Sequence, residues 1–162
     1  MVRLTRVALS VLLVACGATP AVGGDKKKSD KLAVEKALKR LQGTWEQVSV
    51  VADGQKELFA KGMAPLLTIR GDSYTIEAGG RVLERGTWKV EKVSKPAIFD
   101  LITAEGRTKG KTSRGIYEVS ENELRTCIAV TDVNRPTEFT AKTDSGRAVA
   151  VYRRIQPVQP RP

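Results

Sequence analysis

The segment 106–112 (GRTKGKT) partly matches a phosphate-binding P-loop, with two glycines followed by Lys111 and Thr112. A P-loop has four residues between its glycines and leads into a helix, whose first backbone N–H groups hold the phosphates. Only three residues separate the glycines here, and the residues that follow are typical of a strand. We therefore predict a basic hairpin loop at this position and no nucleotide site.

Two carboxylates, Glu121 and Glu123, flank Asn122 and could in principle act as an acid and a base. Glycoside hydrolysis needs such a pair in a cleft, with the pKa of one carboxyl raised. A hairpin tip provides neither condition. Ser145 lies beside Asp144 but has no base, because the chain contains no His. This absence also excludes Cys-His nucleophiles and Cys/His zinc sites. The prediction is a protein that is not an enzyme and holds no metal or cofactor.

The chain has two cysteines, and only one is predicted to be modified. Cys127 lies on a predicted strand with Arg125 on the same face, and without a His we expect an inert, buried thiol. Residues 1–15 resemble a secretory signal peptide, with a basic start and an apolar run far shorter than the ~20 residues of a spanning helix. The run ends in Leu13-Val14-Ala15-Cys16, which resembles the bacterial lipobox.

The lipobox resemblance implies export and acyl chains on Cys16, and therefore anchoring to a membrane of the bacterial cell envelope. The alternative is cleavage after Ala18 or Ala21, which would release a soluble periplasmic or secreted protein. The basic residues at 26–28 suit an anionic membrane surface, although they could equally form a solvated linker. Net charge is +10, but both signs mix after residue 40, so no nucleic-acid partner is predicted.

The spacing of hydrophobic residues divides the rest of the chain into segments. We predict a signal peptide over 1–15, a flexible tether over 16–29, a folded domain over 30–156 and a disordered tail over 157–162. Val34, Ala37, Leu38 and Leu41 form one apolar helical stripe, which predicts a helix over 31–42. A short helical turn is expected over 57–62.

Short alternating segments bounded by turn residues follow residue 43, a pattern typical of an antiparallel sandwich or barrel. Eight strands are predicted, enough to close a barrel that holds side chains or one small ligand. The predicted strands span 44–51, 66–70, 73–77, 81–90, 98–104, 113–120, 123–131 and 148–155.

Gly43 and Trp45 lie where the helix passes into the first strand, and this Gly-x-Trp resembles the lipocalin-type (calycin) signature. The resemblance implies an eight-stranded antiparallel lipocalin-like barrel with a short N-terminal helix. It also implies that Trp45 packs across the barrel bottom beneath an arginine near the end of the last strand. Arg153 and Arg154 both lie there, and Arg153 is the favoured candidate.

The chain as a whole resembles an uncharacterised lipocalin-like domain family expanded in planctomycetes, for which no activity is implied. The motifs behind this resemblance are LQGTW at 41–45, DG at 53–54, GDSYT at 71–75, GTW at 86–88, KGKT at 109–112, GIYE at 115–118 and RPTEF at 135–139.

Three aromatic residues, Tyr74, Trp88 and Tyr117, are candidates for lining a ligand pocket, although aromatic residues in a small barrel usually fill the core. The main hypothesis is an exported, lipid-anchored domain that binds a small apolar or amphipathic ligand. The alternative is a non-catalytic structural or protein-interaction domain of the cell envelope. The sequence itself contains no indication of an oligomeric state.

Overall fold

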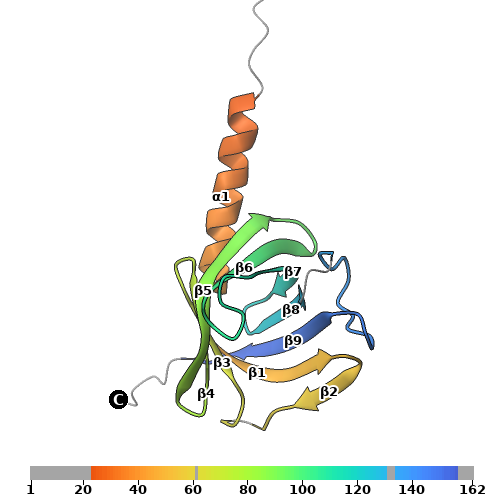
Figure 1. Cartoon of the computed structure of the whole chain (residues 1–162). Coiled ribbons are helices and arrows are strands. Elements are labelled where there is room, and N and C mark those ends of the chain that lie inside the picture. The colour runs from red at the N-terminus through yellow and green to blue at the C-terminus, as the bar shows by residue number, and fades with distance from the viewer. Residues whose placement is uncertain (1–22, 61, 131–133, 157–162) are drawn as a thin grey trace, which may run out of the picture.

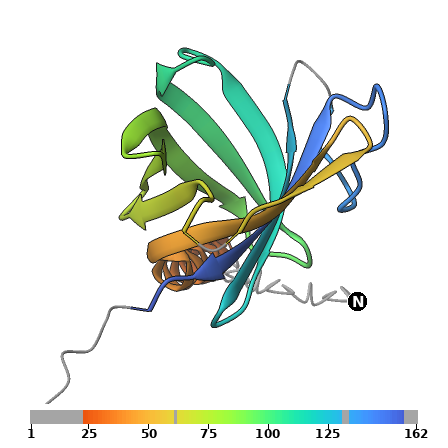
Figure 2. The same cartoon turned by 90° about the horizontal axis from the view of Figure 1, so that it is seen from below.

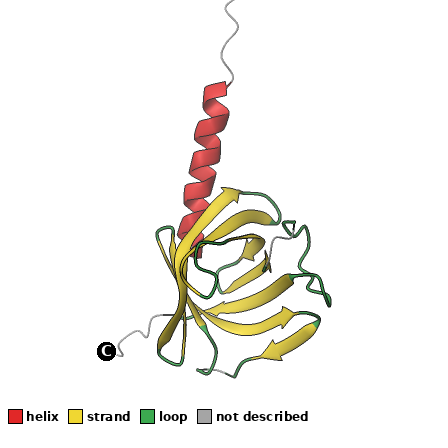
Figure 3. Cartoon of the chain, in the orientation of Figure 1, coloured by secondary structure: helices red, strands yellow, loops and turns green. Residues whose placement is uncertain are grey.

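The computed structural model describes residues 23–60, 62–130 and 134–156. The expected signal peptide, Cys16 and the tail at 157–162 lie outside the described residues. Within these ranges the chain forms one helix, α1, and nine strands (Figure 3).

Helix α1 (Gly23–Leu41) begins eight residues earlier than the prediction of 31–42, so the part of the expected tether at 23–29 is helical. Lysine, abundant in this stretch, has a high helix propensity. Ala37 and Leu41 are buried, and Val34 and Leu38 pack against the same core, so the predicted apolar stripe is the one that faces the barrel. The start of the helix projects away from the barrel (Figure 1).

Eight strands form the predicted closed antiparallel barrel, which is confirmed. Each of strands β3 to β9 pairs with its neighbour in the sequence, and β1 closes the ring by pairing with both β3 and β9 (Figure 2). The strands are β1 (Gly43–Ala52), β2 (Gln55–Leu58), β3 (Leu66–Arg70), β4 (Ser73–Ala78), β5 (Arg81–Lys92), β6 (Ala97–Gly106), β7 (Thr112–Val119), β8 (Glu123–Ala129) and β9 (Arg147–Arg154).

Strand β2 was not predicted, and the helical turn expected over 57–62 is wrong at its start. Glu57 and Leu58 instead pair with the end of β1 in a hairpin. Its turn residues Asp53 and Gly54 have φ angles of 52° and 75°. A two-residue Asp-Gly turn with positive φ at both positions matches the twist of an antiparallel hairpin, and this local signal explains the strand.

The end of the barrel beside α1 is closed by Trp45, which is fully buried. Its indole N–H donates to the carbonyl of Leu41, the last residue of α1, at 2.9 Å. The guanidinium of Arg154 lies over the indole, 3.9 Å from the ring centroid. The predicted arrangement of tryptophan and arginine is therefore present, but Arg153 is the wrong arginine: it is exposed. Residues alternate across a strand, and Arg154 is the one paired in register with Trp45.

Arg154 also ties the end of α1 to the barrel. Its guanidinium donates to the carbonyls of Arg40, Gln42 and Glu121. A cation beside the last carbonyls of a helix satisfies groups that have no partner within the helix. Gly43 makes this approach possible, because its φ is 113° and a Cβ there would lie 3.1 Å from Nη1 of Arg154. Both residues of the Gly-x-Trp motif, Gly43 and Trp45, thus contribute to closing this end of the barrel.

A second buried cluster lies outside the barrel wall, under the segment 134–146. It contains Ile116, Cys127, Ala141 and Val149. Arg135 anchors this segment through an ion pair with Asp100 at 2.6 Å and donates to two strand carbonyls. The outward face of β7, β8 and β9 is therefore partly covered by the chain itself.

Candidate functional site

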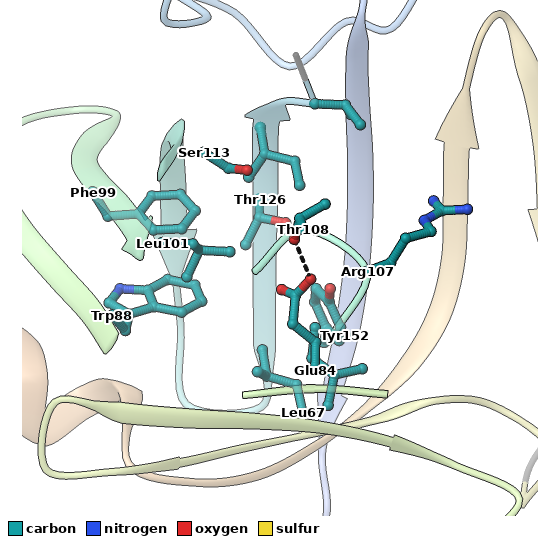
Figure 4. Close-up of a pocket in the computed structure, with 13 residues that line it drawn as sticks. Leu67, Glu84, Trp88, Phe99, Leu101, Arg107, Thr108, Ser113, Thr126 and Tyr152 are labelled. Carbon is teal, nitrogen blue, oxygen red and sulfur yellow. Dashed lines mark hydrogen bonds between the residues drawn. The ribbon is translucent and has the colours of Figure 1, made fainter. Parts of the chain in front are cut away.

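A cavity of about 220 Å³ lies inside the barrel, on the far side of the aromatic core from α1. The chain runs up and down, so the β4–β5 and β6–β7 connections lie at the opposite end from the β5–β6 turn, which borders α1. Residues near those two connections, Glu84, Arg107 and Thr108, line the cavity (Figure 4). We call this end the mouth.

The floor of the cavity is aromatic. Trp88 and Phe99 stack with their ring centroids 4.2 Å apart, and Tyr117 packs edge-on against both rings. Gly115 allows this packing, since a Cβ there would lie 2.5 Å from the ring of Phe99. Leu101 completes the floor beside the two stacked rings (Figure 4). Such rigid rings provide a flat apolar surface for a small ligand.

The polar side of the mouth centres on the carboxylate of Glu84, which is held by hydroxyl groups. Tyr74 donates to Oε1 at 2.7 Å. Thr108 donates to Oε2 at 2.6 Å (Figure 4). Thr103 is buried between these two hydroxyls, 3.1 Å from the Tyr74 oxygen and 3.2 Å from that of Thr108. Burial, more than the nearby carboxylate, raises the pKa of Tyr74 well above its usual value, so its hydroxyl stays a donor. The carboxylate is thus fixed in position.

A second polar group faces the cavity from the opposite part of the wall. Tyr152 and Thr126 occupy adjacent strands, β9 and β8, and both line the space. Burial raises the pKa of Tyr152 to about 12. Its phenol therefore remains neutral at physiological pH and can donate or accept a hydrogen bond.

The three predicted ligand-lining aromatics have three different positions. Trp88 lines the cavity. Tyr74 supports Glu84 from the side and does not line the space. Tyr117 lies behind the stacked rings and lines a groove beside α1 instead. Closure of the barrel, which strand patterns do not describe, decides which inward side chains reach the open space.

Glu84 and Tyr152 line the cavity but were not among the predicted site residues. The sequence does contain an indication of Glu84. This residue shares one face of a predicted strand with Trp88, and a carboxylate at an inward position is unusual in a barrel core. Tyr152 had no comparable signal, because its inward face follows from its pairing with β8.

The residues weighed for catalysis do not converge. Glu121 and Glu123 flank the exposed β7–β8 turn, and Asp144 and Ser145 lie in the segment that covers the outer wall. Cys127 is fully buried, and burial raises the pKa of its thiol. In the described ranges, no group of three or more His, Cys, Asp and Glu side chains could hold a metal ion.

Comparison with protein-family models, curated proteins and solved structures gives no match to this chain. Among the residues that the structure describes, no helix has the length and apolar character needed to cross a membrane.

Proposed function

We propose that the barrel binds one small, largely apolar molecule in the cavity above Trp88 and Phe99. The main support for this proposal is the open space inside the barrel. It has an aromatic floor and a few fixed polar groups at its mouth, which is the usual composition of a ligand site. The resemblance to lipocalin-type barrels supports the same role.

The volume limits the ligand. Pockets for drug-sized molecules occupy roughly 300–1,000 Å³, and a dry cavity of about 150 Å³ accommodates benzene. A cavity of about 220 Å³ therefore suits a single ring with a short substituent. A long acyl chain or a fused polycyclic ligand would require the walls to move.

We also propose that the protein is exported and anchored through a lipid on Cys16. Helix α1 supports this arrangement, because its start projects away from the barrel (Figure 1). Replacing Cys16 with Ser is expected to move the protein from the membrane to the soluble fraction, and an unchanged distribution contradicts the anchor.

Binding can be tested by NMR, because the chain has only two tryptophans and each reports on one end of the barrel. We expect 2-phenylethanol, a single ring with a short substituent, to shift the indole N–H signal of Trp88 in a saturable manner. The signal of Trp45, enclosed at the closed end, should not move. If neither signal moves at millimolar probe, the proposed site does not bind this class of molecule.

A matched pair of variants separates the cavity from the surface. Leu101→Phe adds volume to the floor, whereas Ile102→Phe adds the same ring type on the exposed outer face of β6. The inward change is expected to weaken binding of 2-phenylethanol at least tenfold, and the outward change to leave it unaltered. Equal affinities for the two variants would place the probe elsewhere.

A further inference from the structure

We propose that the natural ligand carries a positively charged amine or ammonium group, which binds to the carboxylate of Glu84. This inference rests on the proposed function and specifies the chemistry of the same cavity. The apolar part of the ligand would lie against Trp88, and its charged end would point to the mouth.

Glu84 is a carboxylate that has no cationic partner among the residues described by the structure. Across the described part of the chain, the ion pairs join Arg85 to Glu105, Lys89 to Glu91 and Arg135 to Asp100, and none includes Glu84. The side chain is only partly exposed, on the wall of an apolar cavity. A carboxylate withdrawn from water is costly unless it is hydrogen-bonded and paired, so a cationic ligand would supply the missing charge.

The existing hydrogen bonds leave room for this ligand. Each oxygen of Glu84 accepts one hydroxyl, from Tyr74 and from Thr108. A carboxylate offers about four acceptor positions in total, so each oxygen retains acceptor capacity. Because the hydroxyls are donors, they stabilise the charged carboxylate and fix its direction.

Among the described residues, Arg107 is the one cation that lines the cavity, and it would favour the opposite choice, an anionic ligand. Its side chain is exposed and its guanidinium points away from Glu84 (Figure 4). The exposed guanidinium is solvated and screened, whereas the carboxylate is fixed at the cavity wall. The observations therefore favour a cation at this site.

The test uses three probes of similar size and different charge: 2-phenylethylamine, 2-phenylethanol and phenylacetate. Affinity is measured from the indole signal of Trp88 in the unmodified protein. Charge-assisted hydrogen bonds are about twice as strong as neutral ones, so we expect the amine to bind about tenfold more tightly than the alcohol. Phenylacetate should bind most weakly.

Glu84→Gln should remove the preference for the amine and change the affinity for the alcohol by less than about threefold. Glu105→Gln is the matched control, because it removes an exposed carboxylate from the neighbouring strand without touching the cavity. It should leave the tenfold preference intact. Where Glu84→Gln does not fold, the probe series on the unmodified protein still decides the question.

The possible failures are distinguishable. Equal binding of amine and alcohol overturns the cationic ligand but leaves the cavity as a binding site. Tightest binding of phenylacetate, lost in Arg107→Gln, overturns it in favour of an anionic ligand. Binding of none of the three probes overturns the proposed function itself.

Discussion

The two ends of the barrel use polar groups in different ways. At the closed end, Arg154 and Trp45 donate to three consecutive carbonyls, at residues 40–42, which would otherwise have no partner at the end of a helix. At the mouth, Glu84 is held by hydroxyls but faces an open space. The closed end joins distant parts of the chain and stabilises the fold, whereas the mouth keeps acceptor capacity for another molecule.

Raising the pH should weaken both ends together, and this is the largest effect we expect. Burial raises the pKa of Tyr117, near the closed end, and of Tyr152, in the cavity wall, to about 12. Unfolded tyrosine ionises near pH 10, so the unfolded chain loses these protons first. The free energy of unfolding therefore has its full value below pH 10. It falls as pH rises from 10 to 12, by about 1.4 kcal/mol per pH unit for each tyrosine.

This prediction is checked by phenolate absorbance and by urea unfolding along the same pH series. At pH 11 the folded protein should show only about a tenth of Tyr117 and Tyr152 as phenolate, while in the urea-unfolded chain about nine tenths of each tyrosine should be ionised. A native protein whose tyrosines ionise near pH 10 would contradict their burial.

Trp45→Ala should cause the largest loss of any single substitution. It removes a fully buried ring and the donor to Leu41, and truncation of a buried tryptophan costs about 3–5 kcal/mol. Trp45→Phe keeps most of the ring and should cost clearly less. Both values follow from urea denaturation. A loss below about 1 kcal/mol for Trp45→Ala would mean that the closed end does not stabilise the barrel.

Arg154→Met should cost about 2–4 kcal/mol, because three carbonyls lose a charged donor and the indole of Trp45 loses its cover. Arg153→Met is the matched control. This neighbour is exposed, so its replacement should change the free energy of unfolding by less than about 0.5 kcal/mol. Equal costs for the two variants would argue against the register of β1 and β9.

The smallest effects concern two tyrosine hydroxyls. Tyr74→Phe removes the bonds to Glu84 and Thr103 and should cost about 1–2 kcal/mol. Tyr117→Phe should be neutral or slightly stabilising, because the buried Tyr117 hydroxyl has no hydrogen-bond partner among the described residues. Thermal unfolding at neutral pH compares the two variants directly, and a larger loss for Tyr117→Phe would contradict the finding that its hydroxyl has no partner among the described residues.

Local patterns were enough to predict the eight barrel strands and the apolar stripe of the helix. The one missed strand, β2, was marked by Asp53 and Gly54, whose turn chemistry is also local. The wrong prediction of Arg153 in place of Arg154 had a cause that is not local. Both lie near the end of β9, and only the pairing of β1 with β9, far apart in the sequence, places Arg154 against Trp45.

By itself, the sequence determined the elements and their alternation, because turn residues and two-residue periodicity act over a few neighbours. Only the tertiary structure decided where the empty space lies. The cavity exists because closure of the ring brings Glu84 from β5, Thr108 from the β6–β7 loop and Tyr152 from β9 around one volume. That volume depends on how distant side chains fill a shared interior, which no single stretch of sequence specifies.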